Sequence, residues 1–107
     1  MPKPVDWTVG ISASILIANG TQVSGKFLLD GANSREVRYR MDGNSITSYI
    51  VYDDNGRAIK RVDLTGKAHA GISTPHVVEY KHNKNPIGDI FIQAEKLVRP
   101  ATAAEIP

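Results

Sequence analysis

The chain contains no cysteine among its 107 residues, which excludes disulfides, thiolate metal sites and thiol nucleophiles. It also lacks any apolar run near the roughly 20 residues that a membrane helix requires, so no membrane span is expected. Residues 1–7 show no charged and then apolar leader, so no secretory signal is expected at this end. A chain of this length predicts a single small domain over residues 1–107.

Several catalytic signatures are absent as well. There is no Gly-x-Ser-x-Gly elbow, which argues against a serine hydrolase, and no phosphate-binding glycine loop, which argues against nucleoside triphosphates. The three histidines are seven and six positions apart, with Asp63 and Glu79 nearby, and match no strong zinc pattern. We therefore expect no metal ion and no other cofactor, with a metal-dependent DNase kept as an alternative.

What is present is a pattern of short strands. Residues 35–41 alternate between apolar and polar, so that Val37, Tyr39 and Met41 share one face. Residues 45–52 are rich in β-branched and aromatic side chains, and Asn55-Gly56 then predicts a hairpin into an antiparallel return over 57–64. A fourth strand is expected over 76–82, after a loop over 65–75. The pattern indicates an antiparallel meander.

The ends of the chain are less regular. Residues 9–18 fit a buried helix or a strand equally, and residues 23–29 suggest a short strand interrupted by Gly25. Residues 1–30 therefore form a segment of uncertain type. From Arg99 onward the chain shows little periodicity, and we expect it to pack loosely. The fold class expected is α+β.

All three histidines, His69, His76 and His82, fall within the most basic segment of the chain. Between positions 57 and 84 there are six Lys or Arg residues against two acidic ones, whereas the whole chain has a net charge of only +2. Clustered positive charge favours a nucleic-acid partner. The residues expected to bind RNA through this charge are Arg57, Lys67, Lys81 and His82.

The strand period sorts these side chains. His76, Tyr80 and His82 fall on one side of the strand over 76–82, and Lys81 falls on the other. His69 belongs to the preceding loop, and a loop folded over the sheet brings it near His76. Two histidines beside one phosphodiester can divide proton removal from a 2′-hydroxyl and proton donation to the leaving 5′-oxygen, without a metal ion.

The run from Ile46 to His69, continuing through Thr74-Pro75-His76-Val77 and Glu79-Tyr80 to Asn85-Pro86, resembles the bacterial domains called polymorphic toxin type 24. The likeness covers residues 31–107 and includes the closing segment 98–107. It implies the C-terminal toxin module of a secreted or cell-surface protein used in contact-dependent growth inhibition. Such a module is delivered into the cytoplasm of a target cell and neutralised by a cognate immunity protein.

The resemblance also implies a ribonuclease with a fold of the barnase, EndoU and RelE group. That group has a small twisted antiparallel sheet with an irregular or helical N-terminal part. Carried onto this chain, the polar motif positions are Lys60, Arg61, Asp63, His69, Thr74, His76 and Tyr80. Two departures are visible, because Ala70 stands where a glycine is expected and Val78 where a histidine is expected.

Together these observations predict a metal-independent endoribonuclease, with tRNA as the expected substrate and a 2′,3′-cyclic phosphate as product. His76 is assigned as general base and His69 as general acid, although the two labels can be exchanged. The transition-state cation is Arg61 or Lys60, and Thr74 and Tyr80 orient the phosphate. A host translation factor is a further possible partner. The alternative from another class is a noncatalytic basic module that binds nucleic acid or protein.

Overall fold

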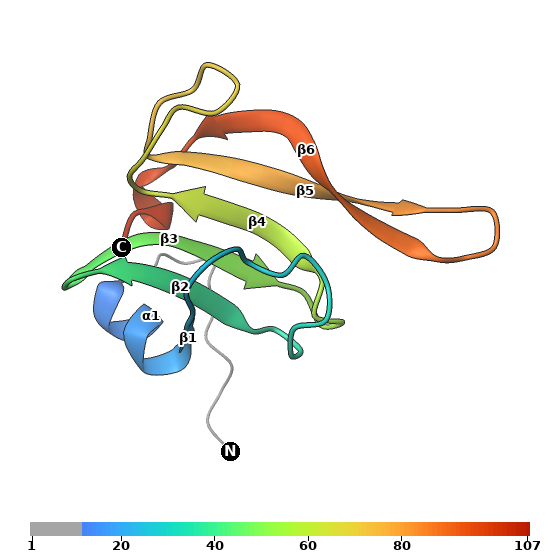
Figure 1. Ribbon diagram of the computed structural model, residues 1–107, viewed down its shortest axis with the longest axis horizontal. Helices are drawn as coiled ribbons and strands as arrows, with labels where there is room; N and C mark the ends of the chain where they lie inside the picture. The colour runs from blue at the N-terminus through green and yellow to red at the C-terminus, as the bar shows by residue number, and fades with distance from the viewer. Residues whose placement is uncertain (1–11) are drawn as a thin grey trace.

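The structure is a computed structural model that describes residues 12–107 (Figure 1). It consists of one six-stranded sheet, a short α-helix and a terminal 3-10 turn. In chain order the elements are α1 (Ala13–Asn19), β1 (Thr21–Gln22), β2 (Val37–Asp42), β3 (Ser45–Tyr52), β4 (Ala58–Asp63), β5 (His76–Lys84), β6 (Ile90–Pro100) and η1 (Ala103–Glu105). The expected α+β class is confirmed. None of the described helices is long and apolar enough to cross a membrane.

The strands lie in the sheet in their sequence order, from β1 to β6. All neighbouring pairs are antiparallel except β1 and β2, which are parallel. The meander expected between residues 35 and 82 is therefore confirmed, with each strand within a few residues of its predicted bounds. The hairpin at Asn55-Gly56 is confirmed too. Gly56 is required there, because its φ is +74° and an added Cβ would lie 2.0 Å from the carbonyl oxygen of Ala32.

The N-terminal part of the sheet differs from expectation. In the stretch over 9–18 whose type the sequence left open, residues 9–11 lie outside the described residues and residues 13–18 are helical. Ser12 caps this helix by accepting a hydrogen bond from the Ile15 amide. The strand predicted over 23–29 is wrong. Gly25 takes a positive φ and breaks the run, and only Thr21–Gln22 pairs with β2.

Two features of the C-terminal part were also not expected. Strand β6 had no counterpart in the sequence pattern, and the tail is not loosely packed. Glu105 is 6% exposed, and its carboxylate accepts hydrogen bonds from Arg99, Lys60 and Thr102. The Tyr49 hydroxyl donates to the Glu105 carbonyl oxygen over 2.6 Å. The prediction failed because this order comes from partners far away in the sequence.

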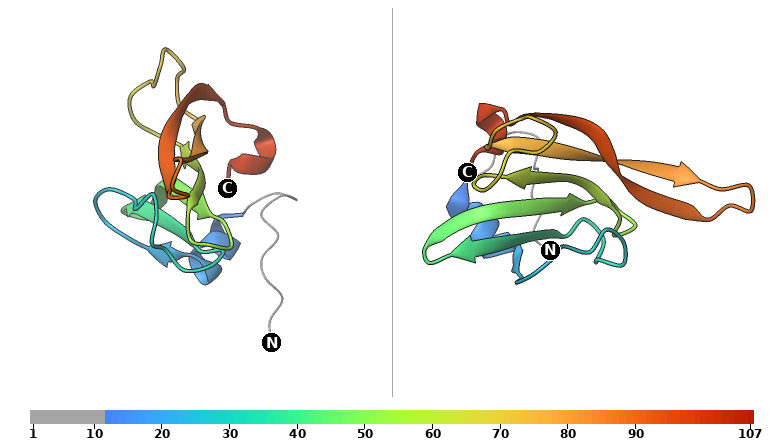
Figure 2. Two further views of the ribbon diagram at one scale, coloured as in Figure 1. Left: turned by 90° about the vertical axis from the view of Figure 1, so that its right-hand side faces the viewer. Right: turned by 45° about the horizontal axis from the view of Figure 1, so that its top comes forward.

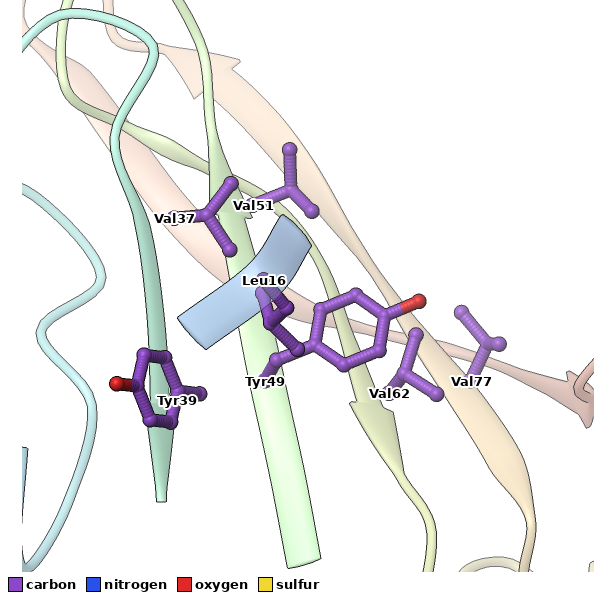
Figure 3. Close-up of a cluster of buried hydrophobic side chains, with 7 residues drawn as sticks. All are labelled: Leu16, Val37, Tyr39, Tyr49, Val51, Val62 and Val77. Carbon is purple, nitrogen blue, oxygen red and sulfur yellow. The ribbon is translucent and has the colours of Figure 1, made fainter. Parts of the chain in front are cut away.

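The main core lies on the sheet face that carries α1 (Figure 3). Leu16 of the helix points at Tyr49 and Val37, and all three are almost fully buried. Side chains from four neighbouring strands complete this cluster, namely Val37, Tyr39, Tyr49, Val51, Val62 and Val77. Burying each large apolar side chain contributes about 1.5–3 kcal/mol, so this face supplies most of the stabilisation.

The opposite face has a smaller apolar cluster and is otherwise polar. Ile50, Tyr52 and Ala58 are buried there beneath the segment between β1 and β2. The Tyr52 hydroxyl donates to the Leu28 carbonyl over 2.6 Å, which ties that segment to the sheet. Beyond this cluster β5 and β6 continue as a hairpin arm that projects past the other strands (Figure 2). The loop over 64–75 rises at the other end of β5 (Figure 1).

Candidate active site

A group of polar side chains lies on the face opposite α1, where β4 and β5 pair. Arg61 and Asp63 of β4 and His76 and Tyr80 of β5 come together there, and His69 joins them from the loop over 64–75. We call these five residues the histidine–arginine cluster. Alternate residues of a strand point to the same face of the sheet, so Arg61 and Asp63 share one face of β4. Asp63 is paired directly with His76, and Arg61 with Val78, which brings the side chains of the two strands together on that face. The intervening Val62 and Val77 point into the main core.

His76 is the best-anchored member of the cluster. It is 1% exposed; its Nε2 lies 2.9 Å from an Asp63 oxygen and its Nδ1 lies 3.0 Å from the Ile72 carbonyl oxygen. A carbonyl oxygen only accepts hydrogen bonds, and so does an ionised carboxylate. Both ring nitrogens of His76 therefore lie within hydrogen-bond distance of an oxygen acceptor.

His69 lies at the exposed side of the cluster. Its ring centroid is 6.1 Å from that of His76, which confirms the expectation that the loop brings the two together. The His69 amide and the Ile72 carbonyl close a two-residue turn, with the reverse bond from Ile72 to His69. Ala70 and Gly71 form that turn with φ values of +50° and +81°. Positive φ at both central positions is the type I′ geometry that favours glycine.

Arg61 connects Asp63, the partner of His76, to a phenol. Its Nε lies 3.1 Å from both Asp63 carboxylate oxygens, and its Nη1 donates to the Tyr80 hydroxyl over 3.3 Å. Burial raises the pKa of Tyr80, against the opposing effect of Arg61, so its hydroxyl keeps its proton at neutral pH. The cluster thus offers a guanidinium and a phenolic donor beside an exposed imidazole.

Lys60 and Thr74 lie outside the cluster. The Lys60 ammonium lies 2.8 Å from Glu105 and 24% of its side chain is exposed, so it belongs to the C-terminal contacts on the other face. Successive strand residues point to opposite faces, and Lys60 and Arg61 therefore cannot serve one phosphate. Thr74 donates to the Gly66 carbonyl over 3.4 Å and closes the base of the loop.

The residues expected to bind RNA are scattered. Arg57 and His82 lie at the far end of β4 and β5, where Arg57 faces Asp30 and His82 bonds the Ala58 carbonyl near Asp53. Lys81 is exposed on the arm, next to Tyr80 in sequence and therefore on the opposite face. Lys67 alone of this set lies in the same loop as His69, and it is exposed.

Two cations that were not predicted as site residues lie beside the cluster. Arg40 and Lys26 line a hollow of about 330 Å³ together with Phe27, Leu29, Arg61 and Tyr80. Arg40 donates from Nε to the buried Ser48 hydroxyl over 2.9 Å, and its guanidinium stacks 4.7 Å from the centre of the Phe27 ring. Alternation over residues 36–40 already placed Arg40 on the polar face. That was the available signal, but no sequence neighbour linked Arg40 to the histidines.

Among the side chains that the structure describes, no group of three or more His, Asp or Glu residues is arranged to hold a metal ion. Asp63 and His76 are neighbours, but Arg61 occupies the remaining side of that carboxylate. The side chains of the cluster can supply proton transfer by an imidazole and charge stabilisation by a guanidinium.

The fold and this site define a small β-sheet domain with a basic, histidine-bearing face. The model of the family described as Bacterial toxin 24 matches residues 18–107, which is most of the chain. The chain therefore belongs to the Bacterial toxin 24 family, and the resemblance predicted from residues 31–107 is confirmed. Neither the curated proteins nor the solved structures contain a match to this chain.

Proposed function

We propose that this toxin domain is a metal-independent endoribonuclease whose site is the histidine–arginine cluster. The observation that carries the proposal is the 6.1 Å separation of an exposed and a buried histidine ring, with Arg61 held beside them by Asp63. Self-cleavage of RNA through its own 2′-hydroxyl needs a base and a cation near one phosphate, and no metal ion.

Within this proposal the two histidines have unequal roles. His69 is exposed and accepts the proton of the 2′-hydroxyl, whereas His76 has both nitrogens engaged and acts as a positioning residue. One ring nitrogen of His76 is hydrogen-bonded to Asp63, and Asp63 in turn binds Arg61. The other ring nitrogen is hydrogen-bonded to the Ile72 carbonyl oxygen, which also accepts a hydrogen bond from the His69 amide. The base label thus moves from His76 to His69.

Arg61 and Tyr80 complete the reaction site. The guanidinium stabilises the negative charge that builds on the phosphorane, and the protonated phenol donates a hydrogen bond to the same phosphate. The 2′-oxygen attacks phosphorus and the bond to the 5′-oxygen breaks. The leaving 5′-oxygen takes up the proton that His69 accepted, and the product carries a 2′,3′-cyclic phosphate. Lys67, exposed in the His69 loop, attracts the neighbouring backbone phosphates.

The wider setting is part of the same proposal. The domain is delivered from a secreted or cell-surface bacterial protein and cleaves RNA, with tRNA as the preferred class, in the target cytoplasm. A cognate immunity protein blocks the site, and a host translation factor presents the RNA. The small sheet with a helix on one face supports an affinity with the barnase, EndoU and RelE group of folds.

The proposal is tested by incubating the purified domain with total RNA and with DNA in millimolar-scale EDTA. We expect RNA fragments with 2′,3′-cyclic phosphate ends and intact DNA. DNA cleavage that requires added Mg²⁺ or Zn²⁺ would favour the metal-dependent DNase instead. RNA binding without cleavage would favour the noncatalytic module, which the burial of His76 and the cations Arg40 and Lys26 beside the cluster also fit.

A further inference from the structure

We propose that the hollow beside the histidine–arginine cluster is a subsite for one guanine nucleotide of the RNA. It is lined by Lys26, Phe27, Leu29, Arg40, Arg61 and Tyr80 and has a volume of about 330 Å³. This inference rests on the proposed function, because it assigns the base that lies next to the bond to be cut. A hollow of this size is at the lower end of the range for small-ligand sites, which starts at about 300 Å³.

The charges in the hollow favour an anionic, acceptor-rich ligand. Three of the six lining residues are cations and none is acidic. Among the side chains that the structure describes, Arg40 and Lys26 have no ion-pair partner, whereas Arg61 is paired with Asp63. A half-buried guanidinium without a carboxylate partner is costly unless a ligand anion or acceptor completes it.

The aromatic residues favour a flat ligand. Phe27 and Tyr80 both line the hollow, and they come from distant parts of the chain, Phe27 from the segment before β2 and Tyr80 from β5. The Arg40 guanidinium carbon lies over the Phe27 ring, 4.7 Å from its centre, so a planar cation already packs on one face of that ring. Proteins that read unpaired RNA bases place them against such rings and guanidinium planes.

The donors select guanine among the bases. Arg40 uses Nε for Ser48 and Nη1 for the Gly25 carbonyl, and its Nη2 makes no hydrogen bond to any described residue. The polar side chains of the hollow can all donate, and guanine alone presents two adjacent acceptors, O6 and N7, on one edge. Adenine and cytosine place an amino donor there instead. Because the hollow and the cluster share Arg61 and Tyr80, the nucleotide lies directly beside the reacting phosphate.

The test uses the full chain carrying His69→Gln, so that binding is measured without cleavage. Guanosine 3′-monophosphate, adenosine 3′-monophosphate and inorganic phosphate are titrated by calorimetry and by amide NMR. We expect guanosine monophosphate to bind about tenfold more tightly than either competitor, with shifts at Lys26, Phe27 and Arg40. Equal affinity for all three ligands, or no shift at those residues, would overturn the proposal.

Two further variants and a control test whether the nucleotide binds in this hollow. Lys26→Ala should lower the affinity for guanosine monophosphate about fivefold or more. Phe27→Leu should lower the affinity for both nucleotides but leave the affinity for phosphate unchanged. Lys84→Ala removes another exposed lysine, on the arm, and is the matched control that should bind as the parent does. An equal effect of Lys26→Ala and Lys84→Ala would show only general charge attraction and overturn the proposal.

The two proposals fail in different ways. If guanosine monophosphate binds as expected but the parent chain cleaves no RNA, the ribonuclease proposal fails and the nucleotide site stands. If RNA is cleaved but sequencing of the ends shows no preference for a base beside the cut, the guanine subsite fails and the ribonuclease stands.

Discussion

The amide of His69 and the Nδ1 atom of His76 both point at one acceptor, the carbonyl oxygen of Ile72, at 3.0 Å each. This shared acceptor fixes the loop over 64–75 to the buried histidine. The opposite nitrogen of His76 is bonded to Asp63, which also receives Arg61. One buried side chain therefore sets the positions of both the exposed imidazole and the guanidinium.

Arg61 and Lys60 are adjacent cations with different surroundings, and they should behave differently. Arg61→Ala removes the charge beside the reacting phosphate and should lower the cleavage rate by about two to three powers of ten. Lys60→Ala removes a bond to Glu105 on the other face and should cost about 1 kcal/mol of unfolding free energy with cleavage unchanged. Cleavage assays and thermal unfolding of both variants check this. A Lys60→Ala chain that folds normally but fails to cleave RNA would contradict the assignment of Arg61 to cleavage and of Lys60 to stability.

The contacts of Glu105 in the C-terminal tail should make the stability of the folded domain depend on pH. Hydrogen bonds from Arg99, and then from Lys60, hold the pKa of Glu105 well below its ordinary value of 4.5. A carboxylate with a lowered pKa in the folded state contributes stability that is present above the unfolded pKa and lost as the pH falls toward the folded one. We therefore expect the Tm to fall as the pH drops below about 4.5.

The Glu105→Gln variant isolates this contribution. It should be less stable than the parent at neutral pH by about 2 kcal/mol, and the difference should shrink as the pH is lowered below 4.5. Asp54→Asn is the matched control, since its carboxylate pairs with Arg35 on the surface and is 69% exposed. The account would be contradicted if the two variants showed the same pH dependence of Tm.

The turn at the tip of the His69 loop carries an alanine in a left-handed conformation. Ala70 has a φ of +50°, which costs a residue with a Cβ about 1–2 kcal/mol. Ala70→Gly should therefore raise the Tm, or leave it unchanged where the greater freedom of the unfolded glycine offsets the gain. Ala68→Gly makes the same change at a residue without positive φ and should lower it. A clear decrease of the Tm in Ala70→Gly would contradict the inference that the left-handed conformation of Ala70 is strained.

Much of the sheet was predictable from local patterns. Alternation around Tyr39, the β-branched run after Ser45 and the Asn55-Gly56 turn each specify structure through neighbours only a few residues apart. The same period placed His76 and Tyr80 together and separated them from Val77. The same alternation places Lys60 and Arg61 on opposite faces of β4, so the two residues were not equivalent candidates for the transition-state cation.

The remaining features depend on contacts across long sequence distances. The order of the tail comes from Arg99, Lys60 and Tyr49 around Glu105, and two of these partners are more than 40 positions away. The hollow likewise joins Lys26 and Arg40 to residues of β4 and β5. No local pattern marks such pairs, because an exposed cation and a cation that completes a site look alike in one sequence.

The most direct test of the account is the rate of RNA cleavage by His69→Gln in EDTA, with RNA affinity measured in parallel and His82→Gln as the matched histidine control. Loss of a group that transfers a proton should lower cleavage by about two to four powers of ten while RNA affinity stays within about threefold of the parent. The His82→Gln chain should cleave as the parent does, because His82 bonds the Ala58 carbonyl far from the cluster. Cleavage by His69→Gln at the parental rate would contradict the account.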